Sequence, residues 1–304
     1  MNSFGSKFRL TTYGESHGIA VGGIIDGCPS GLHIDFNQIE YHLNRRKQNA
    51  PRQESDKVTF LSGILDGITL GTPIAFQIAN NSQQSKDYSQ LEHCFRPGHA
   101  DYTYQAKYGI RDHRGGGRAS ARETVVRVVA GSIARQLIPD IKISAWVKET
   151  SKRQINDSCG GIVSCRITNI APGIGEPIFG RLNALLAHAM MTIPSAVGFE
   201  MGIGFEAAQM QGSEYADKWS CNADGTTITN NCGGIQGGIS NGMPIEFNVA
   251  FHPVVSIPQP TDFLTDDGKI KNFILTGRHD NNHIERIPVI VESMAALVIV
   301  DLIL

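Results

Sequence analysis

Closely spaced cysteine pairs are missing from this sequence. Its six cysteines are scattered along the chain, and no C-x-x-C motif is present. Structural zinc sites usually draw their ligands from such pairs, so no metal site is expected. Met1 is followed by polar residues instead of the basic and apolar segments of a secretory leader, which predicts a cytoplasmic location and reduced thiols.

A long uninterrupted apolar run is also missing. The most apolar segment covers residues 287–304, but Glu292 and Asp301 interrupt it and Pro288 lies near its start. Because a membrane-spanning helix needs about 20 mostly apolar residues, no membrane association is expected. The segment instead predicts a buried helix with proline in its first turn.

Excess charge of either sign is absent, since the formal net charge of the whole chain is −2. A protein that coats a nucleic acid is usually basic and offers aromatic side chains for stacking on bases. Only 7% of the residues here are aromatic. A nucleic-acid-binding protein is the first alternative that the arginine-rich segments suggest, and these two properties argue against it.

The sequence does contain enough apolar residues for a substantial core. Of its 304 residues, 41% are hydrophobic and 18% charged, and the 33 glycines follow no fixed period. No Pro-rich or Ser-rich linker divides the chain, so residues 1–304 are expected to form a single domain. Residues 207–231 are polar and are expected to form a long surface loop or an insertion.

Short β-branched runs occur between segments with helical periodicity. Several of these runs alternate apolar and polar residues, as half-buried antiparallel strands do. The order of the elements is neither strict βαβα nor all-β, which predicts the α+β class. Strands are expected near residues 20–25, 58–61, 74–78, 141–147, 162–167 and 245–249, and helices near 35–47, 120–137, 176–191 and the C-terminus.

Positive charge is concentrated in one segment. Residues 93–127 hold seven lysines and arginines and three histidines against three carboxylates. On a chain with little net charge, such a local cluster suits a small anion. Within the segment, Gly115-Gly116-Gly117 can adopt positive φ angles and lets a ligand approach the backbone closely.

A helix start follows these glycines. Ser120 and Glu123 have the spacing of a capping box, ahead of apolar residues at helical intervals. The loop would therefore bring Arg118 to a helix N-terminus, where unpaired N–H groups and the helix dipole favour a phosphate. The structural alternative is a plain glycine turn before a capped helix, with its arginines in solvent.

Gly14-Glu-Ser-His-Gly18 places Ser16 and His17 in a tight turn. A histidine can donate or accept a proton near neutral pH, although a turn histidine bonded to the backbone is the simpler interpretation. A Ser/His hydrolase is disfavoured because adjacent side chains point in different directions and no G-x-S-x-G motif is present.

Three further segments have both a structural and a functional interpretation. Arg45-Arg46-Lys47 and Arg52 are either cations near a helix C-terminus or a second anion clamp. Residues 231–242 contain five glycines and form either a ligand-binding backbone loop or a pair of hairpin turns. Arg278 could bind an anion, and Asp280 is either a base or the N-cap of the last helix.

Taken together, these segments resemble the chorismate synthase family. The strings RPGHAD and GGGRxSARET are highly specific, and the matching segments occur in the family's order over nearly the whole chain. They are Gly14-Glu-Ser-His-Gly18, Arg45-Arg46, Phe95-Arg-Pro-Gly-His-Ala-Asp101, Arg114-Gly-Gly-Gly-Arg-Ala-Ser-Ala-Arg-Glu-Thr124, residues 230–242 and Gly277-Arg-His-Asp280.

The resemblance implies a carbon–oxygen lyase acting on a phosphate ester, at the last step of the shikimate pathway toward the aromatic amino acids. Its substrate would be 5-enolpyruvylshikimate 3-phosphate, which loses phosphate to give chorismate. The cofactor would be reduced FMN, with NADPH as a possible reductant of the flavin. The implied fold is a β-α-β sandwich with helices packed between antiparallel sheets, assembled as a homotetramer.

The resemblance also implies roles for individual residues. His17 would protonate the departing phosphate, His99 would supply a proton to the reduced flavin, and Asp280 would assist removal of the carbon-6 hydrogen. Substrate contacts would come from Ser16, Arg46, Arg52 and Arg96. Flavin contacts would come from Arg118, Ala119, Ser120, Pro194, Ser195, Gly237, His252, Pro253, Val254, Val255, Ser256 and Arg278.

Several positions differ from the usual family sequence. His252-Pro-Val-Val-Ser256 stands where the family usually has Lys-Pro and small hydroxyl residues, and Ile193-Pro-Ser-Ala-Val-Gly198 lacks a lysine. Asn281-Asn282 replaces Pro-Cys, and the chain ends at Leu304 where relatives continue with a polar tail. These differences suggest an alternative: a flavin-binding or flavin-reducing protein of the same fold with weakened or lost elimination activity.

Overall fold

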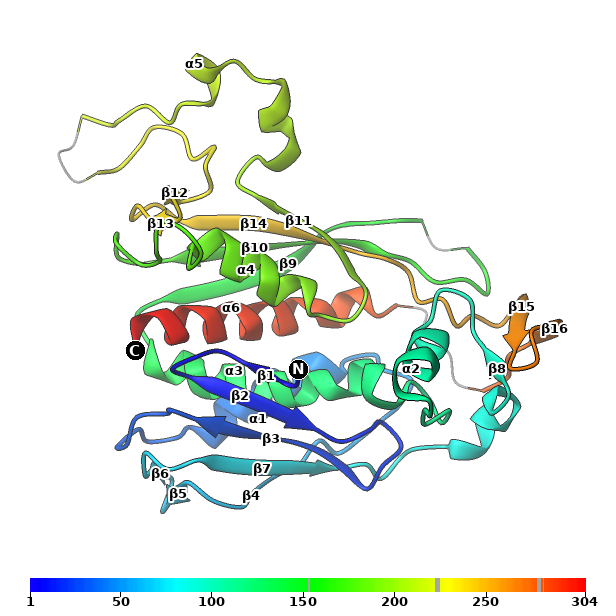
Figure 1. Cartoon of the computed structure of the whole chain (residues 1–304). Coiled ribbons are helices and arrows are strands. Elements are labelled where there is room, and N and C mark those ends of the chain that lie inside the picture. The colour runs from blue at the N-terminus through cyan, green and yellow to red at the C-terminus, as the bar shows by residue number, and fades with distance from the viewer. Residues whose placement is uncertain (153, 222–224, 278–279, 281) are drawn as a thin grey trace.

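Two antiparallel sheets enclose a central layer of helices (Figure 1). The structure is a computed structural model that describes residues 1–304 except 153, 222–224, 278–279 and 281. The buried apolar side chains of both sheets and of the helices form one continuous core. This arrangement confirms the α+β class and the β-α-β sandwich.

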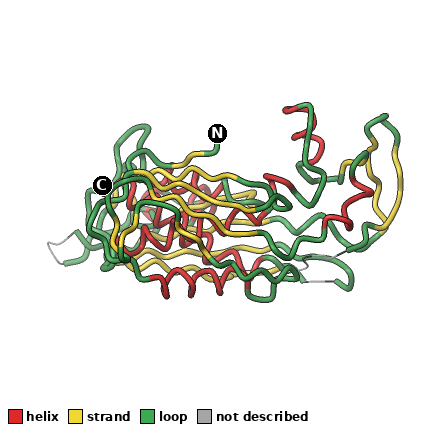
Figure 2. The backbone as a smooth tube through the Cα atoms, turned by 90° about the horizontal axis from the view of Figure 1, so that it is seen from below, coloured by secondary structure: helices red, strands yellow, loops and turns green. Residues whose placement is uncertain are grey.

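The first sheet has the strand order β1-β2-β3-β7-β4. Its inner face carries Val21, Ile25 and Phe76, all fully buried against the helices. Viewed from below, its strands lie across the central helices (Figure 2). The bounds are Ser3–Phe4 for β1, Arg9–Tyr13 for β2, Ala20–Asp26 for β3, Val58–Phe60 for β4 and Ile74–Ala79 for β7, with a separate hairpin of β5 (Ile64–Leu65) and β6 (Ile68–Thr69).

The second sheet has the order β11-β14-β10-β9. Alternate residues of β14, from Ile245 to Phe251, are buried, which confirms the half-buried strand that the apolar–polar alternation predicts. Gly161 pairs with Phe251, and Ile167 pairs with Ile245. The bounds are Lys142–Thr150 for β9, Gly161–Thr168 for β10, Ala196–Met201 for β11 and Ile245–Phe251 for β14.

The helical layer is two helices deep. Helix α3 packs against β2 and β3, and α6 packs against β9 and β10, while α3 and α6 pack on each other. Helix α1 adjoins α3, and α4 adjoins α6 and β11. The bounds are Phe36–Lys47 for α1, Thr124–Leu137 for α3, Leu182–Met191 for α4 and Ile287–Ile303 for α6.

Helix α6 is the buried terminal helix that the sequence predicts, with Pro288 in its first turn. Glu292 is buried and accepts hydrogen bonds from Arg45 and Arg135. Asp301 accepts hydrogen bonds from the backbone of residues 6–8. Within the described residues, no helix combines the length and apolar character that crossing a membrane requires.

Two helix starts differ from the sequence-based expectation. Helix α4 begins at Leu182 rather than near residue 176, because Pro177 and Gly180 interrupt the helical pattern. The α-helix after the glycine loop begins at Thr124, preceded by short 3-10 turns. The carboxylate of Glu123 binds Arg127, one helical turn onward, at 2.8 Å, so the reciprocal capping box does not form.

Smaller elements gather at the end of the molecule opposite the C-terminus, as both Figure 1 and Figure 2 show. They include a three-stranded sheet in the order β16-β15-β8 and the helix α2, which follows the RPGHAD string. The bounds here are Ser85–Leu91 for η1, Cys94–Phe95 for β8, Asp101–Tyr108 for α2, Gly117–Ala119 for η2, Ala121–Glu123 for η3, Pro260–Thr265 for β15, Ile270–Ile274 for β16 and Ile284–Arg286 for η5.

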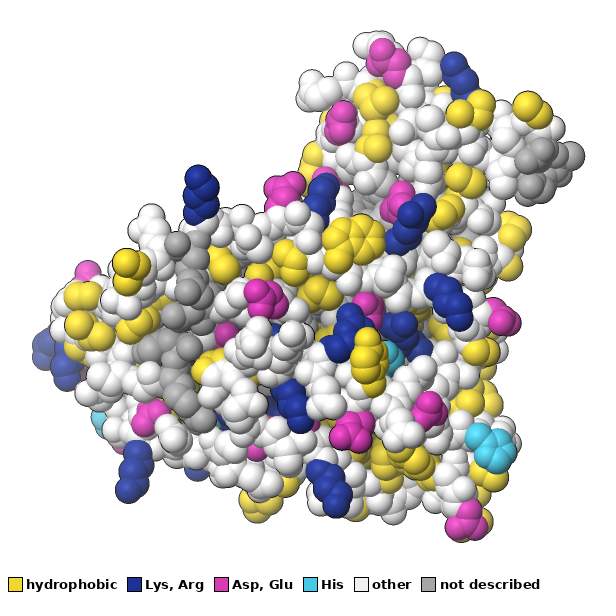
Figure 3. All heavy atoms as spheres, turned by 180° about the vertical axis from the view of Figure 1, so that it is seen from behind, with side chains coloured by type: hydrophobic (Ala, Val, Ile, Leu, Met, Phe, Trp, Pro, Cys, Tyr) yellow, Lys and Arg dark blue, Asp and Glu magenta, His cyan; other side chains and the backbone are white. Residues whose placement is uncertain are grey.

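An arm that includes the expected loop 207–231 stands out from the body (Figures 1 and 3). It contains η4 (Gly204–Gln209) and α5 (Gly212–Tyr215) and exposes Phe205 and Trp219. The short hairpin of β12 (Ile235–Gln236) and β13 (Ile239–Ser240) follows the arm in the chain.

Candidate active site

The turn between β2 and β3 carries His17. Gly14 turns the chain with φ 95°, and an added Cβ atom there would lie 2.3 Å from the carbonyl oxygen of Ala20. The side chain of Asn80, at the end of β7, donates hydrogen bonds to the carbonyls of Glu15 and Gly18 at 3.0 and 2.9 Å. Asn80 therefore stabilises the turn by bonding two of its carbonyl groups.

The ring of His17 is buried and held on two sides. Its Nδ1 lies 2.9 Å from the hydroxyl of Ser85, and its edge meets the ring of Tyr88 at a centroid distance of 5.1 Å. A Cβ atom added to Gly115 would lie 2.9 Å from Nε2 of His17 and 3.0 Å from Oγ of Ser16. The glycine loop therefore passes directly over the two candidate residues of the turn.

Two side chains of the RPGHAD string, together with Arg111, lie around the carboxylate of Asp101. We call Arg96, His99, Asp101 and Arg111 the Asp101 cluster. Arg96 donates to Asp101 through Nε at 2.7 Å and Nη2 at 2.9 Å, and Nη2 also donates to the carbonyl of Gly115 at 2.6 Å. Burial alone would raise the pKa of Asp101, but the hydrogen bonds from Arg96 and His99 outweigh it and hold that pKa well below its usual range.

The Asp101 cluster and the His17 turn thus meet at Gly115. One side of this glycine faces His17 and Ser16, and its carbonyl accepts the hydrogen bond of Arg96. Gly115 has φ 67°, a conformation that favours glycine. The structure therefore brings together three motifs that are far apart in the sequence.

The main cavity, of about 850 Å³, opens beside these motifs. Arg118 lines it and donates from Nη2 to the carbonyl of Thr12 at 3.0 Å. The other terminal nitrogen of Arg118, Nη1, is buried and has no hydrogen-bond partner among the described residues. Other lining residues that bear on the chemistry are His99, Asp101, Tyr104, Arg111, Arg114 and Ala119.

A second cavity of about 330 Å³ adjoins the main one, and both are lined by Arg118 and Ala119. Pro194 lines this second cavity. Ser195 has φ 69°, and its carbonyl accepts a hydrogen bond from the backbone N–H of His252 at 2.9 Å. Ser120 accepts a hydrogen bond from the backbone N–H of Arg122 and so caps η3.

The segment His252–Ser256 runs along the RPGHAD string. A Cβ atom added to Gly98 would lie 3.1 Å from Val255, and Arg96 reaches the hydroxyl of Ser256 at 3.5 Å. Ser158 donates a hydrogen bond to the carbonyl of Val254 at 2.6 Å. The proposed flavin segments 118–120, 194–195 and 252–256 therefore lie on one side of the molecule, around the two cavities and the Asp101 cluster.

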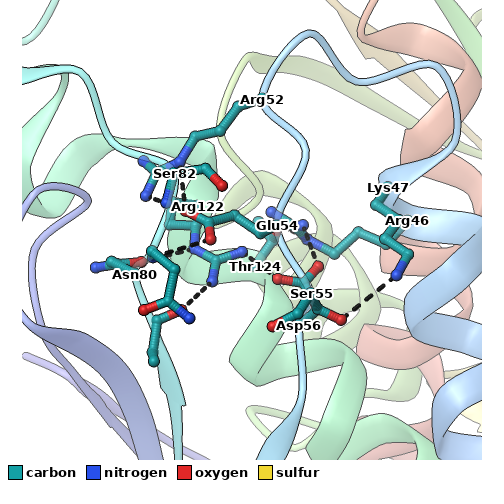
Figure 4. A network of polar contacts seen from close by, with 12 residues as sticks. Arg46, Lys47, Arg52, Glu54, Ser55, Asp56, Asn80, Ser82, Arg122 and Thr124 are labelled. Atoms are coloured by element: carbon teal, nitrogen blue, oxygen red, sulfur yellow. Dashed lines mark hydrogen bonds and ion pairs between the residues drawn. The ribbon is translucent and has the colours of Figure 1, made fainter.

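Two predicted substrate arginines contact protein groups in this structure (Figure 4). Arg46 donates to the hydroxyl of Thr124 at 3.0 Å and lies 3.5 Å from Asp56, and burial lowers its pKa to about 10. Arg52 binds the carboxylate of Glu54 and donates to the carbonyl of Ser16 at 2.8 Å. Arg52 therefore stabilises the His17 turn through its hydrogen bond to the backbone of Ser16.

Asp280 forms an ion pair with Arg286 and does not cap α6, whose N-cap residue is Arg286. Nearby, Nε2 of His283 lies 3.1 Å from the hydroxyl of Ser195, and burial lowers the pKa of His283 to about 4. Arg278, a predicted flavin contact, lies outside the described residues.

Gly237 is the one described flavin candidate that lies away from the others. It occupies the turn between β12 and β13, and no atom lies within 4 Å of an added Cβ. This hairpin is at the end of the molecule where the C-terminus lies, whereas the Asp101 cluster is at the opposite end (Figure 1). A single chain therefore does not bring Gly237 to the cavities.

Sequence reasoning missed Ser85, Asn80 and Asp101, which hold the catalytic candidates in place. Asp101 could have been found, because it is the one carboxylate of the RPGHAD string, within the most cationic segment of the chain. Ser85 and Asn80 carry no such signal, since their roles depend on contacts with residues more than 60 positions away. Among the described residues, no three His, Cys, Asp or Glu side chains form a group that could hold a metal ion.

Comparison with known proteins gives a consistent result. A family model described as chorismate synthase matches residues 8–155 and 150–304. The chorismate synthases of Christiangramia forsetii and Flavobacterium psychrophilum are 48% and 46% identical to the chain, each over 99% of this chain and 96% of the relative. A crystal structure of a chorismate synthase matches with a TM-score of 0.76 and 27% identity, over 98% of this chain and 92% of that one. On the combined strength of the motifs, the sandwich fold and these matches, the chain belongs to the chorismate synthase family.

Proposed function

We propose that this member of the family is a chorismate synthase, a carbon–oxygen lyase that releases phosphate from 5-enolpyruvylshikimate 3-phosphate to form chorismate. The observation that carries the proposal is the contact at Gly115, where His17, Ser16 and Arg96 all lie against the same glycine. The family match over the whole chain supports it. The elimination breaks a carbon–oxygen bond and a carbon–hydrogen bond, so it requires a proton donor at the phosphate and a group that assists removal of the hydrogen.

The substrate carries a phosphate and two carboxylates, and cationic or hydroxyl groups must balance them. The hydroxyl oxygen of Ser16 is buried without a hydrogen-bond partner among the described residues, as expected for a group that contacts a ligand. We propose that Ser16 and Arg96 contact the substrate directly. Arg52 would act on it mainly by supporting the turn that carries Ser16 and His17, and Arg46 would do so from its place beside Thr124 and Asp56.

The residues around the cavities fit a flavin phosphate and ring. The buried Nη1 of Arg118 lacks a partner within the described structure, and an anionic cofactor would supply one. Residues 118–120, 194–195, 252–256 and Arg278 would hold FMN. When bound and reduced, FMN would lend an electron to the substrate and recover it, so the reaction has no net redox change.

Three residues of this chain would move protons. His17, held by Ser85, would protonate the departing phosphate, because a protonated phosphate leaves more easily. His99 would supply a proton beside the cofactor. Asp280 would assist removal of the carbon-6 hydrogen, which requires its carboxylate to exchange its present partner, Arg286, for the bound molecules.

We also propose a cytoplasmic homotetramer. Gly237 is far from the other flavin residues of its own chain, which supports a contact between this hairpin and the cofactor of a neighbouring subunit. NADPH would be a reductant of the flavin in this scheme.

Anaerobic assay with chemically reduced FMN tests the main proposal. Chorismate and phosphate should form in equal amounts. The ion pair of Asp280 favours one alternative, a flavin-binding protein of this fold without elimination activity. That alternative predicts tight binding of reduced FMN with no chorismate, and this result would overturn the main proposal.

A further inference from the structure

The carboxylate of Asp101 is buried at the first residue of α2 and is the centre of the Asp101 cluster. It accepts a hydrogen bond from the side chain of Arg96 and another, of 3.1 Å, from the backbone N–H of Arg96. Nδ1 of His99 lies 3.0 Å from Oδ1 of Asp101, and Nη1 of Arg111 lies 3.8 Å away. One carboxylate thus faces three side chains that can carry positive charge.

Arg96 and Arg111 each have polar partners besides Asp101, whereas no other polar partner of the His99 ring is found among the described residues. Arg96 also binds the carbonyl of Gly115, and Arg111 donates to the carbonyl of Cys94 at 2.9 Å with its guanidinium above the ring of Phe95. Within the described part of the chain, Asp101 is the one side chain with a recorded polar contact to the ring of His99. The orientation of this imidazole therefore depends on Asp101.

The chemistry of the carboxylate determines which nitrogen of His99 carries hydrogen. An ionised carboxylate only accepts hydrogen bonds and repels a bare nitrogen lone pair, so at 3.0 Å it favours the forms with hydrogen on Nδ1. The contact is an ion-pair distance without full hydrogen-bond geometry, because Nδ1 of His99 has no well-aligned acceptor among the described residues. The second nitrogen, Nε2, is then left for a molecule in the main cavity, which His99 and Asp101 both line. This arrangement matches the general rule that the partner of one ring nitrogen sets the role of the other.

His17 has a different kind of partner. Its Nδ1 faces the hydroxyl of Ser85, which can either donate or accept a hydrogen bond. The hydroxyl of Ser85 by itself does not select a tautomer of His17, whereas the carboxylate of Asp101 favours the Nδ1-protonated forms of His99.

We propose that Asp101 is a positioning residue that keeps hydrogen on Nδ1 of His99 and directs Nε2 into the main cavity. The role of His99 in proton transfer rests on the proposed function, but its tautomer does not. Asp101 would act through His99 and would not itself contact the reacting atoms.

The nitrogen-15 spectrum of the histidine rings in the wild-type protein tests this assignment without any change to the cluster. The His99 signals, identified by their loss in His99→Gln, should show hydrogen on Nδ1, as the neutral Nδ1–H tautomer or as the imidazolium. Detection of the Nε2–H tautomer in the wild type would overturn the proposal. This readout does not depend on whether the protein forms chorismate, so failure of the proposed function would be recognised separately.

Asp101→Asn tests the consequence for catalysis. The amide can present either a donor or an acceptor to Nδ1, so the His99 signals should shift toward a mixture of tautomers. We expect kcat to fall roughly 10- to 100-fold with a smaller change in KM, as when an outer partner of a functional histidine is removed. Asp101→Glu, which retains the charge, should recover part of the loss in kcat.

Asp26→Asn is the control. Asp26 also pairs with an arginine, Arg9 at 2.7 Å, but it lines neither of the two cavities. It should leave both kcat and the His99 signals unchanged. If Asp101→Asn folds with wild-type His99 signals and wild-type kcat, or if Asp26→Asn lowers kcat equally, Asp101 has no positioning role.

Discussion

Close packing of the backbone against His17 constrains which residue can stand at position 115 of the candidate site. Gly115 and Gly109 both have positive φ angles, 67° and 75°. An added Cβ atom would press on the ring of His17 at Gly115, whereas at Gly109, which ends α2, it would meet nothing within 4 Å. The two glycines therefore separate the cost of backbone conformation from the cost of crowding His17.

Replacing each glycine with alanine tests this separation. Both Gly115→Ala and Gly109→Ala should lose roughly 1 kcal/mol of unfolding free energy, because alanine rarely adopts positive φ. Only Gly115→Ala should also lose most of its chorismate-forming activity, since His17 must move. Denaturant unfolding and steady-state kinetics of the two variants provide the comparison. Equal activity in both would show that the His17 contact is unimportant.

A buried histidine outside the site predicts how stability depends on pH. Burial, together with the charge of Arg135, lowers the pKa of His42 to about 4. Between pH 6.5 and 4 the unfolded chain binds a proton that folded His42 does not, so stability should fall as pH drops through this window. The loss attributable to His42 would be about 3 kcal/mol when complete.

Unfolding at pH 7 and pH 4.5 measures this effect. His42→Gln should make the difference in unfolding free energy between the two pH values smaller than in the wild type. His93→Gln, which removes an exposed contact with Asp266, should change that difference much less, because exposed ion pairs contribute little. An unaltered pH dependence in His42→Gln would contradict the assignment.

At the scale of elements, Glu292 ties helix α6 to two other helices and a strand. Its carboxylate is 4% exposed and binds Arg45 of α1 and Arg135 of α3. It also accepts a hydrogen bond of 3.0 Å from the backbone N–H of Ala145, on strand β9. In the sequence, Glu292 is visible only as an interruption of an apolar run. Its contacts are with arginines more than 150 residues away in the chain, which the local sequence does not reveal.

Glu292→Gln should therefore be strongly destabilising. Removing one partner of a buried ion pair leaves uncompensated charge, here on two arginines, and costs about 3 kcal/mol or more. Asp26→Asn, which breaks the exposed pair with Arg9, should scarcely change the melting temperature. Thermal unfolding of both variants measures the contrast, and similar melting temperatures for the two would refute it.

The elements that the sequence predicts well are those with a strong local pattern. Strand β14 and helix α6 were predicted from alternation and from apolar content, and the N-cap of α1 from Asp35, whose side chain accepts from the backbone of Asn37 and Gln38. The sheet of β8, β15 and β16 was missed because β8 has only two residues and lies far from β15 in the chain, while β15 and β16 show no regular apolar–polar alternation. The motifs predict which residues form the site, but the contacts at Gly115 and Asp101 required the three-dimensional structure.

At the scale of the whole molecule, the continuous core supports the proposal that residues 1–304 form one domain. The hairpin with Gly237 and the Asp101 cluster lie at opposite ends of this body (Figure 1). If both contribute to one flavin site, they must come from different subunits of the proposed homotetramer. The assembly would then be a condition for activity.

Subunit mixing tests this idea. A bulky substitution, Gly237→Trp, should impair flavin binding and cost roughly 1 kcal/mol of unfolding free energy, because φ is 62° but no atom lies within 4 Å of an added Cβ. Unfolding and refolding it together with His17→Ala should produce mixed tetramers in which some sites are intact, so activity should exceed that of either variant alone. No recovery, in tetramers shown by light scattering to be mixed, would argue that each site is built from one chain.

The central proposal is that His17 and His99, from motifs about 80 residues apart, act on one bound substrate. Single-turnover formation of chorismate, under anaerobic conditions with reduced FMN, tests it most directly. His17→Ala and His99→Ala should each slow the reaction by about 10²- to 10⁴-fold, the usual contribution of a general acid or base. The double variant should lose much less than the product of the two effects, because the residues act as a unit. Wild-type rates in both single variants would contradict the account.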